Sequence, residues 1–165
     1  MRTLLLSGVR YAGLIILVFW LAGWWRSQGM VAVGTTLMPV EVQDLQGRWQ
    51  PLPESGQAQL LYLFAPWCTI CDLTIDGIND LQQANSSIRP VALSYDSVGE
   101  VREFVGPHAD PRGILLGTSA LGRELKVQAF PSYLVVDGSG VVVARRSGYM
   151  PGWLLRLYLH WYGVI

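Results

Sequence analysis

The sequence predicts an α/β domain with a mixed β-sheet, preceded by one apolar N-terminal helix. Strand-like and helical patterns alternate twice, and a hairpin pattern with a final helix follows them, an order typical of sheets with mixed strand directions. The only two cysteines, Cys68 and Cys71, stand between an apolar strand-like run and the first helical pattern. Near the N-terminus, residues 11–25 form an apolar run without a charge.

Composition limits the functional classes. The 165 residues are 51% hydrophobic and 15% charged, and the formal net charge is +0. This length suits one domain with an additional segment. No basic patch stands out, so nucleic acid is not an expected partner.

The N-terminal run predicts a membrane anchor. Arg10 precedes residues 11–25 and Arg26 follows them. A span needs about 20 residues, and the run reaches that length on the N-terminal side of Arg10 if this side chain extends to the interface. Basic residues ahead of the run favour an N-terminus inside the cell. We expect an uncleaved anchor at 1–27 and a tether at 28–38.

Two alternatives to this anchor remain open. Ala32-Val33-Gly34 offers a small-x-small site at which a signal peptide is cleaved. The apolar run also suits a buried helix of a soluble domain. With either an anchor or a signal peptide, residues 39–165 are exported into an oxidising compartment, where a dithiol finds disulfide substrates.

Alternation and helical periodicity place the elements of the exported part. Gln46-Gly47 separates two strand-like runs and predicts a hairpin. Ser97 and Glu100 form a capping box that opens a helix. In order, we expect strands at 40–45, 48–52 and 59–65, a helix from the cysteines onward, a strand at 90–95, a helix to about Val105, a short helix that Ser119 caps and that runs to Lys126, strands at 130–137 and 141–145, and a helix from Pro151 to about Tyr162.

The segment Trp67-Cys68-Thr69-Ile70-Cys71 predicts dithiol chemistry. Thiols spaced i, i+3 are close enough to form a reversible disulfide. If the spacing opens a helix, the first sulfur lies at the helix N-terminus, where unpaired N–H groups and the helix dipole favour a thiolate. The thiolate is the attacking species in disulfide exchange.

Other interpretations of the cysteines are weaker. A zinc site lacks a second cysteine pair, and His108 and His160 lie far apart in sequence. A structural staple across so short a loop removes little chain entropy. Inert core cysteines remain an alternative.

The motifs resemble the thioredoxin superfamily over roughly residues 39–162. The segment 64–71 resembles the strand, turn and redox motif, and 130–133 resembles the cis-proline segment of that family. The hairpin and final helix after it resemble the family's ending. The N-terminal hairpin and apolar run are similar to the exported, membrane-anchored TlpA/ResA-type branch, and the aromatic final helix resembles suppressor-of-copper-sensitivity proteins.

This resemblance implies a thioredoxin-like fold with an N-terminal β-hairpin extension and a set of roles. Cys68 is the nucleophile, Cys71 resolves the mixed disulfide, and the pair forms a redox disulfide. A cis bond between Phe130 and Pro131 places the Phe130 backbone beside Cys68, where an extended substrate pairs with it. Trp67 shields the sulfurs. Neither a cofactor nor a metal is expected.

The chain departs from thioredoxin near the cysteines. Tyr62 stands where thioredoxin has a buried carboxylate, and Asp72 stands where a basic residue is usual. TlpA/ResA-type proteins often have a glutamate just after the second core strand, and Asp96 lies at that point here. Asp96 is therefore the nearest acidic candidate to help deprotonate Cys71.

We expect a protein-disulfide reductase. Negative charge at Asp72 opposes a thiolate, and a less stabilised thiolate makes the disulfide less oxidising. The resemblance implies protein thiol and disulfide substrates, a membrane electron donor of the disulfide-reductase type, and a single-pass protein of the bacterial inner membrane with its catalytic domain in the periplasm. Alternatives are a disulfide oxidase or isomerase, and a thioredoxin-like copper-binding chaperone, in which two thiolates suit Cu(I) and His108 is the only further candidate.

The final helix, residues 151–162, is apolar on nearly every side. A terminal helix of this type packs one face on the sheet. We expect the other face to lie against the membrane interface, the anchor or a partner protein. The alternative is that the core covers more of it.

Overall fold

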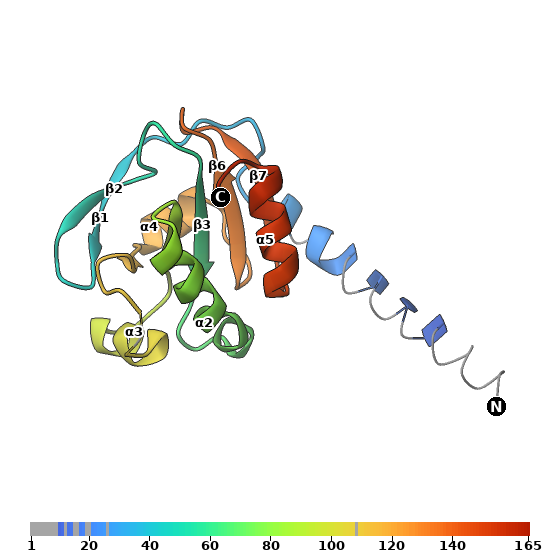
Figure 1. Ribbon diagram of the computed structural model, residues 1–165, viewed down its shortest axis with the longest axis horizontal. Coiled ribbons are helices and arrows are strands. Elements are labelled where there is room, and N and C mark those ends of the chain that lie inside the picture. Colours follow the sequence, from blue (N-terminus) through green and yellow to red (C-terminus); the bar gives the residue numbers. More distant parts are fainter. Residues whose placement is uncertain (1–9, 12, 15–16, 19–20, 26, 108) are drawn as a thin grey trace.

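A seven-stranded sheet with the order β2-β1-β5-β4-β3-β6-β7 forms the centre of the fold (Figure 1). The computed structural model describes residues 10–11, 13–14, 17–18, 21–25, 27–107 and 109–165. The strands are β1 (Val40–Asp44), β2 (Trp49–Leu52), β3 (Gln59–Phe64), β4 (Ile88–Ala92), β5 (Leu115–Leu116), β6 (Ser132–Val136) and β7 (Val142–Ser147). The helices are α2 (Thr69–Ala84), α3 (Val98–Val105), α4 (Ser119–Glu124) and α5 (Gly152–Trp161).

Strand β3 organises the sheet. It pairs with β4 in parallel and with β6 antiparallel, which confirms the predicted mixed α/β sheet. Every residue of β3 is buried, and successive side chains point to opposite faces. Tyr62 and Phe64 enter the core beneath α2, α3 and α5, whereas Leu61 and Leu63 enter the core on the other side.

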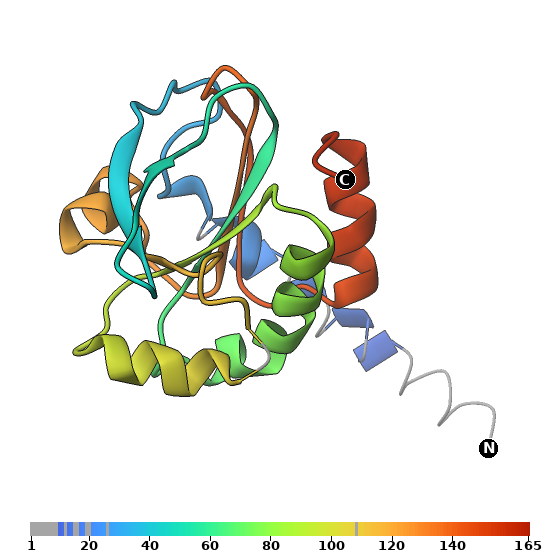
Figure 2. The ribbon, with the colours of Figure 1, turned by 60° about the vertical axis from the view of Figure 1, so that its left-hand side comes forward.

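Helices cover both faces of the sheet. Helices α2 and α5 lie on one side, and α4 lies on the other, as Figure 2 shows. Ile75 of α2 and Leu155 of α5 belong to the first core, and Leu121 of α4 belongs to the second. The predicted hairpin is present as β1 and β2, and β1 extends the sheet beyond β5.

Several predicted boundaries are wrong. Strand β4 runs from Ile88 to Ala92 rather than over residues 90–95, because its pairing with β3 begins at Ile88 and ends at Ala92, whereas β5 pairs only with Val91 and Ala92. A proline at the strand start is usual, but here the missing N–H of Pro90 lies where one side of β4 is still an edge. The cap of α4 is Thr118 rather than Ser119, since the Thr118 hydroxyl accepts from the Leu121 amide at 3.1 Å.

The anchor predicted at 1–27 falls largely outside the described residues. Those described between residues 10 and 25 are helical, and their side chains are mostly exposed. Within the described part of the chain, no helix is both long enough and apolar enough to cross a bilayer. The anchor therefore stays a prediction.

Residues 28–38, predicted as a tether, pack against the domain. Met30, Val31 and Leu37 are buried in the core on the α4 side. The Arg145 guanidinium of β7 donates to the carbonyls of Met30 and Val31 at 2.6 and 2.8 Å, and the Val31 amide donates to the Leu125 carbonyl at 3.0 Å. The chain that follows the predicted anchor is thus held on the domain.

We expect Arg145→Met to destabilise the protein by about 1–3 kcal/mol, because it leaves two carbonyls of this segment without a charged donor. Chemical unfolding of the full chain in detergent measures the loss. Arg112→Met is the matched control, since Arg112 makes a surface ion pair with Asp110 that is worth less than about 1 kcal/mol. Equal effects of both changes would show that the Arg145 contacts contribute nothing specific.

Candidate active site

Helix α2 begins at the first cysteine. After β3, Pro66 ends the extended run, and the Cys68 amide turns back to the Ala65 carbonyl at 3.0 Å. Cys68 is the N-cap of α2 with an extended backbone, and its sulfur accepts from the Cys71 amide at 3.3 Å. The first sulfur therefore lies where unpaired helix N–H groups point.

The two thiols differ in burial. Cys68 retains 9% of its accessible surface and Cys71 has 0%. Both cysteines are free. Burial, followed by a hydrogen bond with Cys68, raises the pKa of the Cys71 thiol to about 12, whereas a hydrogen bond from the Tyr62 hydroxyl acts in the opposite direction. Cys71 is thus a protonated, inaccessible thiol at neutral pH.

The predicted cis bond between Phe130 and Pro131 is confirmed. Side chains behind the bond fix this loop at the start of β6. The Ser132 hydroxyl donates to the Ala129 carbonyl at 2.7 Å and lies 2.8 Å from the Ser147 hydroxyl. The Gly148 amide donates to the Pro131 carbonyl at 2.9 Å. The loop is therefore tied to β7 on its inner side.

Trp67 connects three loops of the site. Its indole N–H donates to the Ser94 carbonyl, in the loop after β4, at 2.7 Å. Its ring meets the Phe130 ring edge-to-face, with 5.6 Å between centroids. The side chain is still 62% exposed, so it forms a wall of the site that water and a partner can reach. That it shields the sulfurs stays a prediction.

The two aspartates lie at the surface. Asp72 is exposed in the first turn of α2. Asp96 is exposed just before α3, and its amide donates to the Glu100 carboxylate at 2.8 Å. The groups that act on the pKa of Cys71 belong to Cys68, Ala65 and Tyr62. A role for Asp96 in deprotonating Cys71 stays a prediction.

Sequence reasoning missed two hydroxyl groups near Cys71. Thr74 of α2 lies 2.6 Å from the Tyr62 hydroxyl, and Tyr133 of β6 stands directly opposite Tyr62 across the sheet. The two tyrosine rings lie 5.4 Å apart. The sequence marks Tyr62 only as the residue that replaces a buried carboxylate. The signal for the others was positional, because Tyr133 follows the cis-proline by two residues and Thr74 lies one turn after Cys71.

Nothing in the described part of the chain gathers three or more His, Cys, Asp or Glu side chains into a metal site. His160 is exposed on α5. His108, the further candidate ligand of the copper-chaperone alternative, lies outside the described residues.

Solved structures share this arrangement of sheet and helices. A thiol:disulfide interchange protein of the thioredoxin family from Chlorobium tepidum superposes with a TM-score of 0.68 at 17% identity, covering 82% of this chain and 99% of that protein. This chain has a thioredoxin-like fold.

Two further structures with the thioredoxin-like fold are similar to this chain. A thio-disulfide isomerase from Thermus thermophilus has a TM-score of 0.62 at 22% identity, over 82% of this chain and 99% of that one. The exposed lipoprotein thioredoxin Etrx1 of Streptococcus pneumoniae has a TM-score of 0.61 at 17% identity, over 74% and 98%. No protein-family model matches the sequence, and no curated protein does.

We expect iodoacetamide to label Cys68 and to leave Cys71 unmodified between pH 7 and 9. With a pKa of about 12, the Cys71 thiolate is scarce in this range and gains about tenfold per pH unit. Mass spectrometry of the reduced chain gives the labelled site. In the Cys68→Ser control the remaining thiol should stay unreactive, and equal labelling of both cysteines would contradict the burial of Cys71.

Proposed function

We propose that this chain is a thiol:disulfide oxidoreductase that acts on protein disulfides outside the cytoplasm. One observation carries the proposal: a cysteine caps α2, the Trp67 ring just before it packs on Phe130 of the cis-proline loop, and a second, fully buried cysteine lies within the first turn of the same helix. The similar proteins from Chlorobium tepidum and Thermus thermophilus are named for thiol–disulfide exchange.

The geometry supports a two-step exchange. The Cys68 thiolate attacks one sulfur of a substrate disulfide, forms a mixed disulfide and releases the first substrate thiolate. Cys71 then loses its proton and attacks the Cys68 sulfur. The bond between Cys68 and the substrate breaks, and the second substrate thiolate takes up a proton from solvent. The substrate gains two electrons and the dithiol becomes a disulfide.

The loop at Phe130 suits an extended substrate. In the described part of the chain, no hydrogen bond occupies the backbone N–H or carbonyl of Phe130. Trp67 packs edge-on against the Phe130 ring and is largely exposed. A substrate segment can therefore pair with this backbone as an added strand, with the Trp67 ring as one wall.

We favour reduction over oxidation. The first turn of α2 contains Asp72 and no basic residue. The helix start thus presents no basic side chain beside the first cysteine, whereas strongly oxidising dithiol proteins owe their reduction potential to a strongly stabilised thiolate. Electrons must then reach the Cys68–Cys71 disulfide from a donor, for which we propose a membrane protein of the disulfide-reductase type.

The full chain should reduce insulin with dithiothreitol as the electron source, and Cys68→Ser should abolish this turnover. Cys71→Ser should accumulate mixed disulfides with substrates, because the resolving thiol is gone. Non-reducing gels of cells that express each variant reveal the adducts, with Cys68→Ser as the matched control. Adducts that depend on Cys71 rather than Cys68 would contradict the assigned roles.

The redox potential of the dithiol should lie nearer the about −270 mV of thioredoxin than the about −120 mV of a strong oxidant. Equilibration with glutathione or dithiothreitol buffers measures it. A value near the oxidising end would identify an oxidase. Stoichiometric Cu(I) binding without disulfide turnover would instead identify the copper chaperone.

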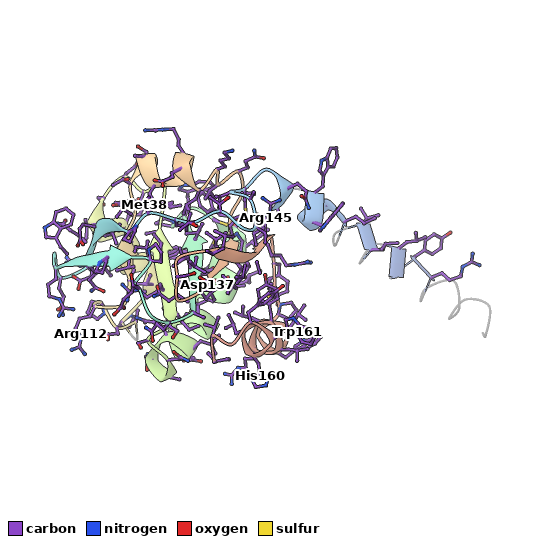
Figure 3. All side chains as sticks on the ribbon, turned by 90° about the horizontal axis from the view of Figure 1, so that it is seen from above. Met38, Arg112, Asp137, Arg145, His160 and Trp161 are labelled. Atoms are coloured by element: carbon purple, nitrogen blue, oxygen red, sulfur yellow. The ribbon has the colours of Figure 1, made fainter. Side chains whose placement is uncertain are left out.

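A membrane location is proposed from the apolar surface near the N-terminus. Helix α5 buries Leu155 and Leu159, which leaves Trp153, Leu157 and Trp161 exposed in one line at 70%, 60% and 82%. The N-terminal segment leaves the domain on the same side as Trp161 (Figure 3). Helix α5 has no acidic residue. We propose that residues 1–27 anchor the chain in a bacterial inner membrane and that α5 rests on its periplasmic interface.

In nanodiscs, Trp161→Phe and Trp153→Phe should each lower the fraction of tryptophan emission that brominated lipids quench. The reason is that both indoles are expected at the lipid interface. Trp49→Phe is the matched control, since Trp49 is 65% exposed on β2 at the opposite edge of the sheet. If aqueous iodide quenches Trp161 as strongly as Trp49, the interfacial position is wrong.

A further inference from the structure

Two tyrosine hydroxyls lie buried beside the resolving thiol. Tyr62 of β3, Tyr133 of β6 and Cys71 of α2 each have 0% exposure and share one core cluster. Tyr62 and Tyr133 are direct cross-strand partners. Burial, followed by the charge of Cys71, raises the pKa of both tyrosines well above the usual value. They are neutral hydrogen-bond donors at every physiological pH.

The hydrogen bonds assign a direction to the Tyr62 proton. The Thr74 hydroxyl has one hydrogen, and it lies 3.0 Å from the Cys71 carbonyl and 3.4 Å from the Ile70 carbonyl. In its 2.6 Å contact with Tyr62, Thr74 is therefore the acceptor and Tyr62 the donor. Rotation about the phenolic C–O bond can redirect this hydrogen from Thr74 to another acceptor.

The Tyr133 hydroxyl is a poorly used donor. It is buried and makes no hydrogen bond of ordinary geometry among the described residues, although the Thr74 hydroxyl and the Met150 backbone lie near enough to oppose the rise that burial causes in its pKa. A buried hydroxyl without a partner is costly, and such a group is a reason to look for an acceptor that forms during function. The Cys71 sulfur becomes such an acceptor when it loses its proton.

We propose that Tyr62 and Tyr133 donate hydrogen bonds to the Cys71 thiolate as it resolves the mixed disulfide, in place of a buried carboxylate. This assignment rests on the proposed function, of which it is the second step. Cys71 transfers its proton toward solvent, Tyr62 turns its hydrogen from Thr74 to the sulfur, and Tyr133 donates a second hydrogen bond to the sulfur. The thiolate then attacks the Cys68 sulfur, and the departing thiolate takes up the proton.

Two tyrosine hydroxyls beside the thiol act differently from a buried carboxylate. A buried carboxylate accepts the thiol proton and adds negative charge beside the thiolate. Two neutral hydroxyls add no charge and stabilise only the deprotonated sulfur. Among the described residues, the titratable groups that interact with Cys71 are Cys68 at the start of α2, Tyr62 on β3 and Tyr133 on β6.

The test follows the two steps separately. Reaction of the reduced full chain with an aromatic disulfide, 5,5′-dithiobis(2-nitrobenzoate), releases one coloured thiolate when Cys68 attacks and a second when Cys71 resolves. Loss of a hydrogen bond to a charged sulfur raises its pKa by about one unit. The thiolate then becomes about tenfold scarcer but about threefold more nucleophilic, so resolution slows about threefold.

We expect Tyr62→Phe and Tyr133→Phe each to slow the second phase about threefold between pH 6 and 8, and the double variant about tenfold, with the first phase unchanged. Thr74→Val should speed the second phase, because it removes the acceptor that competes for the Tyr62 hydrogen. Thr74→Ser keeps that acceptor and should behave as the wild type. A structural defect would slow the second phase in every variant, whereas the proposal expects it to slow in the tyrosine variants and to speed up in Thr74→Val.

Tyr158→Phe is the matched control, since it removes the hydroxyl of a partly buried tyrosine of α5 that packs against the same core. An unchanged second phase in both Tyr62→Phe and Tyr133→Phe would overturn the proposal, as would a slowing confined to Asp96→Asn. The reagent is not a protein, so the two coloured phases report on Cys71 even if insulin turnover fails. The coloured phases therefore test the role of the tyrosines, and insulin turnover separately tests the action on protein disulfides.

Discussion

Burial of the Cys71 thiol beneath the first turn of α2 is the constraint on which the site depends. The sulfur lies against β3, whose residues are all buried, so its surroundings are fixed by the centre of the sheet. Burial keeps Cys71 protonated and out of reach. It leaves Cys68, at the helix start, as the sulfur that a partner meets. The difference between two cysteines of one motif thus comes from depth in the fold.

A small number of polar contacts connect the loops around this buried sulfur to the sheet. Trp67 joins the loop after β4 to the loop at Phe130, and Ser132 and Gly148 tie that second loop to β7. A rigid loop loses little conformational entropy when an extended segment docks on it, as proposed above for substrates. On the opposite face, Arg145 holds the segment that leads to the N-terminus. The candidate active site and the segment that leads to the proposed anchor therefore belong to one packed unit.

Much of the fold could be predicted because its signals are local. The hairpin around Gly47, the capping box at Ser97 and the periodicity after Cys71 each depend on neighbours within a few residues. The start of β4 could not be predicted from Pro90. A proline is tolerated inside a strand where the neighbouring strand does not pair with it, and the local sequence of β4 does not show how far β5 extends. Likewise the docked segment 28–38 depends on Arg145, more than a hundred residues away.

By itself, the sequence determined the i, i+3 cysteine pair, the helix that follows it, the proline loop and the apolar N-terminal run. These are contiguous motifs, and their chemistry depends on residue type and spacing. Only the tertiary structure decided what surrounds the second sulfur. Tyr62, Thr74 and Tyr133 come from β3, α2 and β6, and no spacing relates them. They meet because an antiparallel pair places Tyr133 opposite Tyr62 while α2 crosses above both, and this long-range packing gives Cys71 hydroxyl neighbours in place of a carboxylate.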